Sequence, residues 1–230
     1  MTYKELINEV LVRLREETVA SDWSGAINDS ATVEDYQKVI GSLVNDAKRS
    51  IESYHDWLVL RETKDINTIV GTKNYSLASG QEFKVLDVVN NSTGNQLAQV
   101  SRTYLNSIMY PTDPTGEPNY YGFNGADSSN NLKVDLSPIP DVVQTISFDI
   151  VKYQDTLTNA TTVVKIPSQP IILGAYARAI AERGEDGGTQ SSIAAQEAAS
   201  SLAQAVMMDS GNAKYENDWY VETNYNHTNR

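Results

Sequence analysis

The feature that most constrains the fold is a long amphipathic stretch from Thr32 to Trp57. Its apolar residues recur at steps of three and four, which places them on one stripe of an α-helix and leaves charged residues on the other faces. The stripe comprises Val33, Tyr36, Ile40, Leu43, Val44, Ala47, Ile51, Tyr54 and Trp57. Thr32 is the expected N-cap. A helix of about 26 residues is roughly 39 Å long, which makes this stretch a scaffold rather than a chemical site.

A shorter helix precedes this stretch. The segment Tyr3–Glu17 has helical periodicity, and its apolar face is formed by Leu6, Ile7, Val10, Leu11 and Leu14. The segment Ala20–Ala31 is rich in Ser, Asp, Asn and Gly and is expected to be a loop anchored by Trp23 and Ile27. We therefore expect residues 1–57 to form an antiparallel helical hairpin.

Beyond Trp57 the periodicity changes to that of β-strands. Leu132, Val134 and Leu136 alternate with polar residues, and Val142–Tyr153 is the best strand of the chain. The turns expected between strands are Asn91–Asn95 and Asp127–Asn131, a short helix is expected at Arg102–Tyr110, and a loop at Pro111–Asn119. About seven short strands at regular spacing predict a small antiparallel sandwich or barrel over residues 58–166.

Helical periodicity returns from Pro167 onward. One helix is expected to end at Gly184, and a second, alanine-rich helix is expected over Ser191–Asp209. Small side chains let a helix approach its neighbours closely, so this second helix is expected inside a bundle or at a contact between subunits. The predicted class is α+β. N-terminal (1–57) and C-terminal (167–212) helices form one bundle, the antiparallel β-sandwich or barrel-like region is inserted between them, and residues 213–230 form an extended arm.

Composition narrows the classes of function. The net charge is −12 and the pI is about 4.6, so the surface repels DNA phosphates and disfavours specific nucleic-acid binding. The chain has no cysteine, which excludes disulfides and thiolate metal sites. No apolar run approaches 18 residues, so we expect neither a membrane span nor a signal peptide.

No motif for a reaction is present. The two histidines, His55 and His227, lie far apart in the sequence, and there is no Gly-rich phosphate loop or nucleophile elbow. A glycosidase-like pair of carboxylates has four candidates, and we expect all of them to be solvated turn residues: Asp113, Glu117, Asp127 and Asp141. We expect no catalytic residue, no cofactor and no metal.

The C-terminal segment is polar overall but carries several large apolar side chains. It contains large side chains without helical period, namely Tyr215, Trp219, Tyr220, Val221 and Tyr225. Such a segment either packs back on its parent domain or orders on a partner, where Tyr and Trp supply contact energy. The sequence leaves both readings open. We take the second as the working expectation, so that Ser210–Arg230 is unordered before assembly.

The order of these segments resembles the head-to-tail adaptor proteins of short-tailed bacteriophages, of the tail tubular protein A type. The resemblance lies in the helical hairpin LINEVLVRLREE plus VIGSLVNDAKRSIESYHDW and the β stretch after it. It continues in the loop PTDPTGEPNYYGF and the late helix IILGAYARAIAERGED, which an alanine-rich helix follows. The resemblance covers nearly the whole chain, in the order of the segments and in their amino-acid composition. The family has no catalytic residues to carry over.

The resemblance implies a structural virion protein of the neck and tail, assembled in the host cytoplasm. About twelve copies form a ring beneath the portal protein, extend the DNA ejection channel and support the tail nozzle protein. DNA passes through the lumen without specific binding, and no membrane is involved. The arm residues Tyr215, Trp219, Tyr220, Val221 and Tyr225 contact the portal. The residues expected in the tail-facing loop are Pro111, Pro114, Pro118, Tyr120 and Tyr121.

Two other classes of function remain open at this point. In a carbohydrate- or receptor-binding virion module, Tyr120, Tyr121 and Phe123 form a platform for stacking. In a polysaccharide-degrading enzyme, the four loop carboxylates supply the acid and the base. The long helices favour the adaptor, because small lectins are usually all-β.

Overall fold

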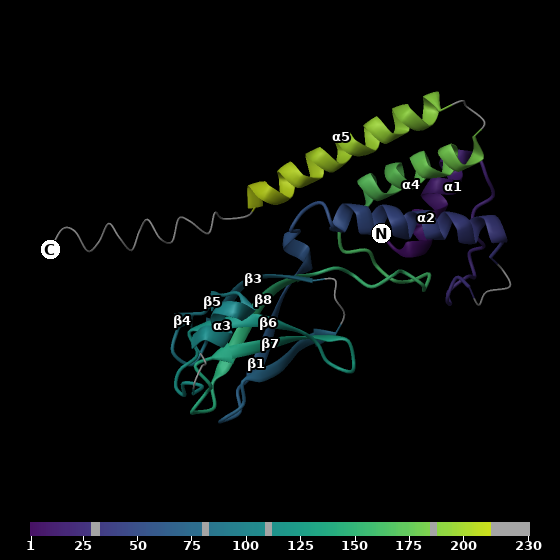
Figure 1. Ribbon diagram of the computed structural model, residues 1–230. Coiled ribbons are helices and arrows are strands. Elements are labelled where there is room, and N and C mark those ends of the chain that lie inside the picture. Colours follow the sequence, from purple (N-terminus) through teal and green to yellow (C-terminus); the bar gives the residue numbers. More distant parts are fainter. Residues whose placement is uncertain (29–32, 80–82, 109–111, 185–187, 213–230) are drawn as a thin grey trace, which may run out of the picture. The chain divides into compact units, whose positions relative to one another are not determined.

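The computed structural model describes residues 1–28, 33–79, 83–108, 112–184 and 188–212. These residues form a mixed α+β structure with five α-helices and two sheets (Figure 1), so the predicted α+β class is confirmed. The chain divides into two units. The helical unit combines Met1–Val59 with Gln154–Arg230, and the β unit is the continuous segment Leu60–Tyr153.

Helices from both ends of the chain meet in the helical unit. Its elements are α1 (Tyr3–Leu14), α2 (Asp35–Glu52), α4 (Ser168–Arg183) and α5 (Thr189–Asn212). Helices α1 and α2 pack against each other and against α4, and α5 packs along α4 (Figure 1). The face expected for the first helix is the buried one, with Leu6, Ile7, Val10 and Leu11 fully buried. Trp23 and Ile27 anchor the following loop, with 3% and 6% of their surface exposed.

Helix α1 is bounded by local signals at both ends. Thr2 and Glu5 form a capping box, in which the Glu5 amide donates to Thr2 Oγ1 and the Thr2 amide donates to Glu5 Oε2. Arg15 adopts a left-handed conformation with φ of 60° and ends the helix. The expectation that this helix extends to Glu17 was therefore wrong by one turn.

Helix α2 is shorter than the amphipathic stretch that predicts it. It ends at Glu52, after which Trp57 turns back and donates from Nε1 to the carbonyl oxygen of Ile51 at 2.9 Å. Trp57 is buried and Tyr54 is exposed, so the last two residues of the expected stripe do not belong to the helix. The expected N-cap, Thr32, lies outside the described residues, and the expectation was wrong because the N-cap of α2 is Glu34.

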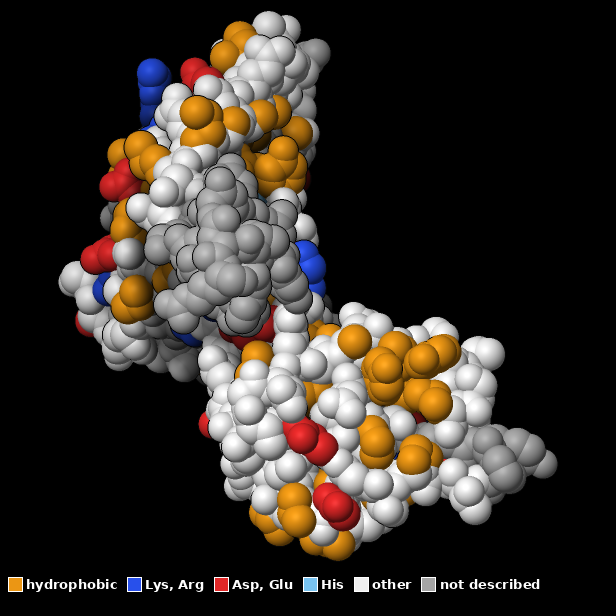
Figure 2. Space-filling view, turned by 90° about the vertical axis from the view of Figure 1, so that its left-hand side faces the viewer, with side chains coloured by type: hydrophobic (Ala, Val, Ile, Leu, Met, Phe, Trp, Pro, Cys, Tyr) orange, Lys and Arg blue, Asp and Glu red, His pale blue; other side chains and the backbone are white. Residues whose placement is uncertain are grey.

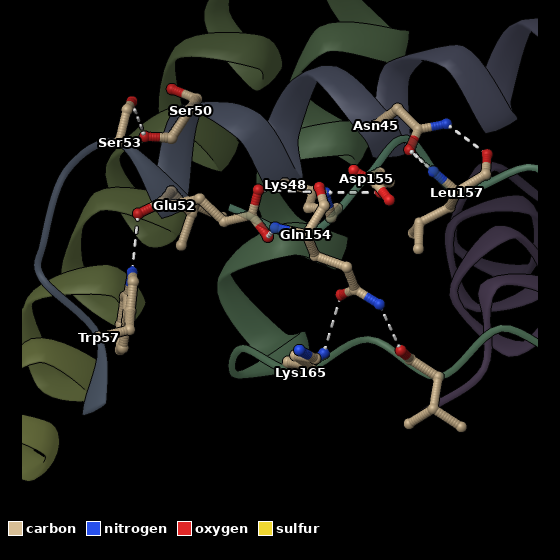
Figure 3. A network of polar contacts seen from close by, with 12 residues as sticks. Asn45, Lys48, Ser50, Glu52, Ser53, Trp57, Gln154, Asp155, Leu157 and Lys165 are labelled. Atoms are coloured by element: carbon tan, nitrogen blue, oxygen red, sulfur yellow. Dashed lines mark hydrogen bonds and ion pairs between the residues drawn. The ribbon is translucent and has the colours of Figure 1, made fainter. Parts of the chain in front are cut away.

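The opposite face of α2 is not wholly solvated, as the periodicity suggested. Lys48 and Glu52 are buried, with 3% and 1% of their surface exposed, and their side chains pair at 3.1 Å. Lys48 Nζ also donates to the carbonyl oxygens of Gln154 and Asp155, and the Gln154 amide donates to Glu52 Oε1 (Figure 3). Burial raises the pKa of Glu52, and the neighbouring Lys48 opposes that rise.

Asn45, one turn before Lys48, continues this network along α2. Its Nδ2 donates to the carbonyl oxygen of Leu157 at 2.9 Å, and its Oδ1 accepts from the Leu157 amide at 2.8 Å (Figure 3). Gln154 in turn bonds the backbone of Val163 and Lys165. The segment 154–166, which we expected in the β region, is tied to α2 in this way and is grouped with the helices.

The β unit contains two four-stranded sheets. The strands are β1 (Arg61–Asn67), β2 (Asn74–Ser79), β3 (Phe83–Asn90), β4 (Asn95–Gln96), β5 (Ala98–Gln99), β6 (Tyr120–Ala126), β7 (Asn131–Ser137) and β8 (Thr145–Lys152). One sheet has the order β1-β8-β3-β4 and the other β2-β7-β6-β5; all pairs are antiparallel except β5 with β6. Helix α3 (Arg102–Ile108) packs on β6.

Both sheets contribute to one hydrophobic core. The strand predicted most strongly, β8, is central in its sheet and supplies Ile146, Phe148 and Ile150. Leu77, Val134 and Leu136 enter the same core from the other sheet. The alternation seen in the sequence thus identified core residues of β7 and β8 correctly, although in β7 Leu132 is only partly buried and Asp135 and Ser137 are buried as well.

The predicted turn at Asp127–Asn131 connects β6 to β7 and is organised by one carboxylate. Asp127 accepts hydrogen bonds from Asn131, from the Ser129 amide and from Ser76 Oγ. These bonds, those from Asn131 first, lower the pKa of Asp127 to about 2. Asn130 adopts a left-handed conformation with φ of 61°, which Asn tolerates better than most residues.

We expect Asp127→Ala to remove part of the acid sensitivity of the β unit. The folded-state pKa of Asp127 lies below its ordinary value of 3.8, so its ionised form stabilises the fold above that pH and loses this effect as pH falls toward 2. Thermal unfolding measured between those limits should show a difference from the parent that is largest at the higher pH. The control is Asp141→Ala, an exposed carboxylate of the same unit. A difference that grows in acid would contradict the assignment.

Candidate functional site

Helix α5 is the most exposed long element of the helical unit. All residues of this helix are described, and only Ala194 is buried. Three large apolar side chains are largely exposed: Ile193 (53%), Met207 (75%) and Met208 (74%). Its charged residues are Glu197 and Asp209 alone. The alanine-rich helix is therefore not interior to a single chain, and the other predicted role, a contact between subunits, stays a proposal.

A groove lies between α5 and the two helices beneath it, within the helical unit. It has a volume of about 230 Å³. Helix α2 contributes Ala47, Ser50 and Ile51; α4 contributes Pro170, Gly174, Ala177 and Arg178; and α5 contributes Ala195, Ala198, Ala199 and Leu202. Most of the lining residues are apolar and small, with Ser50 and Arg178 as the polar ones, so the groove has room for a bulky apolar group. We refer to it as the α2–α4–α5 groove.

Arg178 is the one charged residue that lines this groove. It is partly buried, and it makes no hydrogen bond or ion pair within the part of the chain that the structure describes. By contrast, Arg183, five residues further along α4, pairs with Glu16 and lies over the ring of Tyr36, with 4.9 Å between its Cζ and the ring centroid. A partly buried guanidinium without an acceptor favours an occupant that carries a carboxylate or an aromatic ring.

The C-terminal end of α5 is fastened to the loop after α2. Asp209 Oδ2 lies 3.0 Å from His55 Nε2 and accepts from the Leu58 amide at 3.2 Å. His55 also contacts the ring of Trp57 edge to face. His55 thus has a structural role, in which it holds the last turn of α5 against the segment that follows α2.

The residues predicted for a tail-facing loop fall into different environments. Pro111 lies outside the described residues. Pro114 and Tyr120 are partly exposed, whereas Pro118 and Tyr121 are buried. Tyr121 packs edge to face on Phe148 and belongs to the core, so its ring is not presented to a partner.

The aromatic platform considered for a sugar is not assembled. Phe123 packs against the core and against Tyr121, and Tyr120 meets Tyr104 edge to face at 5.9 Å between ring centroids. Hydrophobic side chains do reach the surface, and on the face in Figure 2 they form several groups separated by backbone and other side chains. Nothing in this set offers three coplanar faces for stacking.

The four loop carboxylates have separate structural surroundings. Asp113 pairs with Lys73 at 3.0 Å, and Asp141 is exposed. Glu117 accepts from Thr93 and Asn95, and these bonds, that from Thr93 first, lower its pKa. Asp127 holds the β6–β7 turn. A general acid needs a raised pKa, so the surroundings of Glu117 and Asp127 suit ionised acceptors.

The described residues contain no group of His, Asp and Glu side chains arranged to hold a metal ion. None of their helices combines the length and the hydrophobicity that crossing a bilayer requires. The predicted arm residues, Tyr215, Trp219, Tyr220, Val221 and Tyr225, lie outside the described part of the chain.

The α2–α4–α5 groove was missed by sequence reasoning. Its signal was nevertheless present, because Ala195, Ala198, Ala199 and Leu202 recur at three- and four-residue steps on one face of the helix.

A protein-family model described as SU10 adaptor protein matches residues 1–221 of the chain. None of the curated proteins compared with the chain matches it.

Proposed function

Because the chain belongs to the SU10 adaptor protein family, a family of phage adaptor proteins, we propose that it forms a head-to-tail adaptor ring. In this proposal about twelve copies join the portal protein to the tail nozzle protein and extend the DNA ejection channel, as in adaptors of the tail tubular protein A type. The role is structural and involves no catalysis. The protein acts in the neck of the virion after assembly in the host cytoplasm.

The observation that carries the proposal is helix α5. A helix with Ile193, Met207 and Met208 exposed, small alanines between them and few charges has the composition of a contact surface. We propose that α1, α2, α4 and α5 act as one bundle whose neighbours in the ring cover α5. The two sheets of the β unit, which share a core, then act as a sandwich that presents its loops, including Pro114 and Tyr120, to the tail.

The charge of the chain supports passage of DNA. A channel wall that binds phosphates tightly would slow ejection, whereas a chain with a net charge of −12 repels them weakly over a screening length of about 8 Å. DNA is thus a passing cargo and not a ligand.

The arm supplies the contact with the portal. We expect the full-length chain, mixed with its purified portal ring, to sediment with that ring on a density gradient. A chain that ends at Asn212 keeps all of α5 but lacks the aromatic residues, and it should sediment separately. The matched control replaces Asn217, Asn224 and Asn226 with Ser, which leaves every aromatic residue of the arm in place. A full-length chain that fails to move with the portal would refute the proposal.

A further inference from the structure

We propose that in the free protein the C-terminal arm of each chain docks into its own α2–α4–α5 groove. The occupant is the segment 213–230, and the side chains that enter are those around Trp219 and Tyr220. This inference goes beyond the adaptor role, since it concerns where the arm lies before any partner is met. For the free chain it replaces the working expectation that the segment from Ser210 onward is unordered: residues 210–212 belong to α5, and the segment 213–230 packs back on its parent domain.

The dimensions of the groove suit an aromatic side chain. A cavity of roughly 150 Å³ lined by apolar side chains binds benzene, and this groove measures about 230 Å³. The alanines and Gly174 that line it leave room for a ring, and Ile51 and Leu202 offer apolar contact. Burial of an indole or phenol ring there removes apolar surface from water on both partners.

The chemistry of the arm matches the one charge in the groove. Trp219 and Tyr220 are flanked by Asp218 and Glu222. Arg178 has no acceptor among the described residues, and a guanidinium both pairs with carboxylates and stacks on aromatic rings. A segment that carries aromatic rings and acidic side chains close together can therefore place a ring against the apolar lining and a carboxylate against Arg178 at the same time.

The arm is long enough and starts in the right place. Leu202 lies ten residues before Asn212 on the helix, which is about 15 Å along its axis. Seven extended residues from Asn212 to Trp219 span roughly 23 Å, so the ring reaches the groove after the chain reverses. The bonds of Asp209 to His55 and Leu58 hold the last turn of α5 in place, which fixes the root of the arm.

Attachment to the same chain favours this occupant over a separate one. A tethered segment experiences an effective concentration in the millimolar range, far above that of a second copy in dilute solution. Docking keeps the aromatic residues away from water until a partner competes for them. It also reduces the apparent affinity of the arm for that partner, in proportion to the fraction of chains whose arm is undocked.

The test uses the free full-length protein, without portal. Trp23 and Trp57 are buried, so quenching of fluorescence by acrylamide reports mainly on Trp219. Ala199→Phe fills the groove, and Ala203→Phe places the same ring on an exposed part of α5 outside the lining. We expect Ala199→Phe to raise quenching severalfold and to speed chymotrypsin cleavage at Trp219 and Tyr220 about tenfold, because cleavage follows the population of released arm. Arg178→Glu should act in the same direction, and Ala203→Phe should match the parent.

Far-ultraviolet circular dichroism and melting temperature verify that each variant is folded. Protection that is unchanged by dilution over about a hundredfold range supports docking within one chain, since a tether makes it independent of concentration. Protection that disappears on dilution assigns the groove to a second copy and overturns the proposal. Equal, fast cleavage in the parent and in Ala199→Phe overturns it too. Neither result bears on whether the arm later binds the portal.

Discussion

Replacing Lys48 with methionine is expected to lower the free energy of unfolding by about 3–5 kcal/mol, the range for breaking a buried ion pair. Lys48 and Glu52 are nearly inaccessible to water, and Lys48 also satisfies the carbonyl oxygens of Gln154 and Asp155. Methionine fills a similar volume but leaves a carboxylate and two carbonyls without their donor. Denaturant unfolding of the full chain measures the loss.

Two controls make this result specific to the buried pair. Lys38→Met removes an exposed pair with Asp35 on the same helix and should change the free energy of unfolding by at most about 0.5 kcal/mol. The double variant Lys48→Met, Glu52→Leu removes both charges and should recover much of the loss. If the single and double variants are equally unstable, the unpaired carboxylate is not the cause.

The loss of stability expected for Lys48→Met also depends on pH, and the direction of that dependence follows from the pKa of Glu52. Burial raises the pKa of Glu52 above its ordinary value of 4.5, and removal of Lys48 takes away the strongest of the groups that oppose this rise. A raised folded-state pKa gives stability that is present below the unfolded value and is lost as pH rises through the folded value. Lys48→Met should therefore be closest to the parent in acid, below about pH 4.5, and furthest from it near neutrality.

Gly41→Ala is expected to destabilise the protein by about 1–3 kcal/mol through overpacking, although alanine is the better helix former. A Cβ at this position would lie 2.5 Å from Ile27 Cδ1 and 2.5 Å from Tyr3 Oη. Tyr3 is buried and its hydroxyl is bonded to Asn45, so it has little freedom to move. Thermal unfolding of the variant should show a clearly lower melting temperature.

The matched control is Gly174→Ala on α4. A Cβ there meets Ala47 Cβ at 3.5 Å, an ordinary contact, so helix propensity should dominate and stabilise the fold by up to about 1 kcal/mol. The change in the free energy of unfolding should therefore have opposite signs for Gly41→Ala and Gly174→Ala, which tests the role of packing directly. A loss at both positions would mean that close approach at Gly41 is not the determining factor.

Periodicity predicted which side chains are buried wherever a single face meets the core. It placed Ile146, Phe148 and Ile150 correctly on β8 and identified the buried face of α1. It failed where burial depends on a distant segment. Lys48 and Glu52 look solvated in the sequence because the backbone that satisfies them follows the whole β unit.

The groove illustrates a second limit. The alanines of α5 indicate a face that another segment can approach closely. The sequence does not say whether a segment of the same chain occupies that face. The sequence is even less informative about Arg178, because its lack of an acceptor among the described residues becomes visible only once the surrounding helices are placed. Aromatic residues misled in the opposite direction, because Tyr121 serves the core and is not presented at the surface.

The division of the helical unit between the two ends of the chain has a consequence for biosynthesis. When α1 and α2 leave the ribosome, α4, which covers them both, has not been made, and the entire β unit must be translated first. Nascent chains fold from the N-terminus at the pace of translation, so this hairpin waits with its apolar face uncovered. Products that terminate before α4 lack that cover and cannot complete the helical unit.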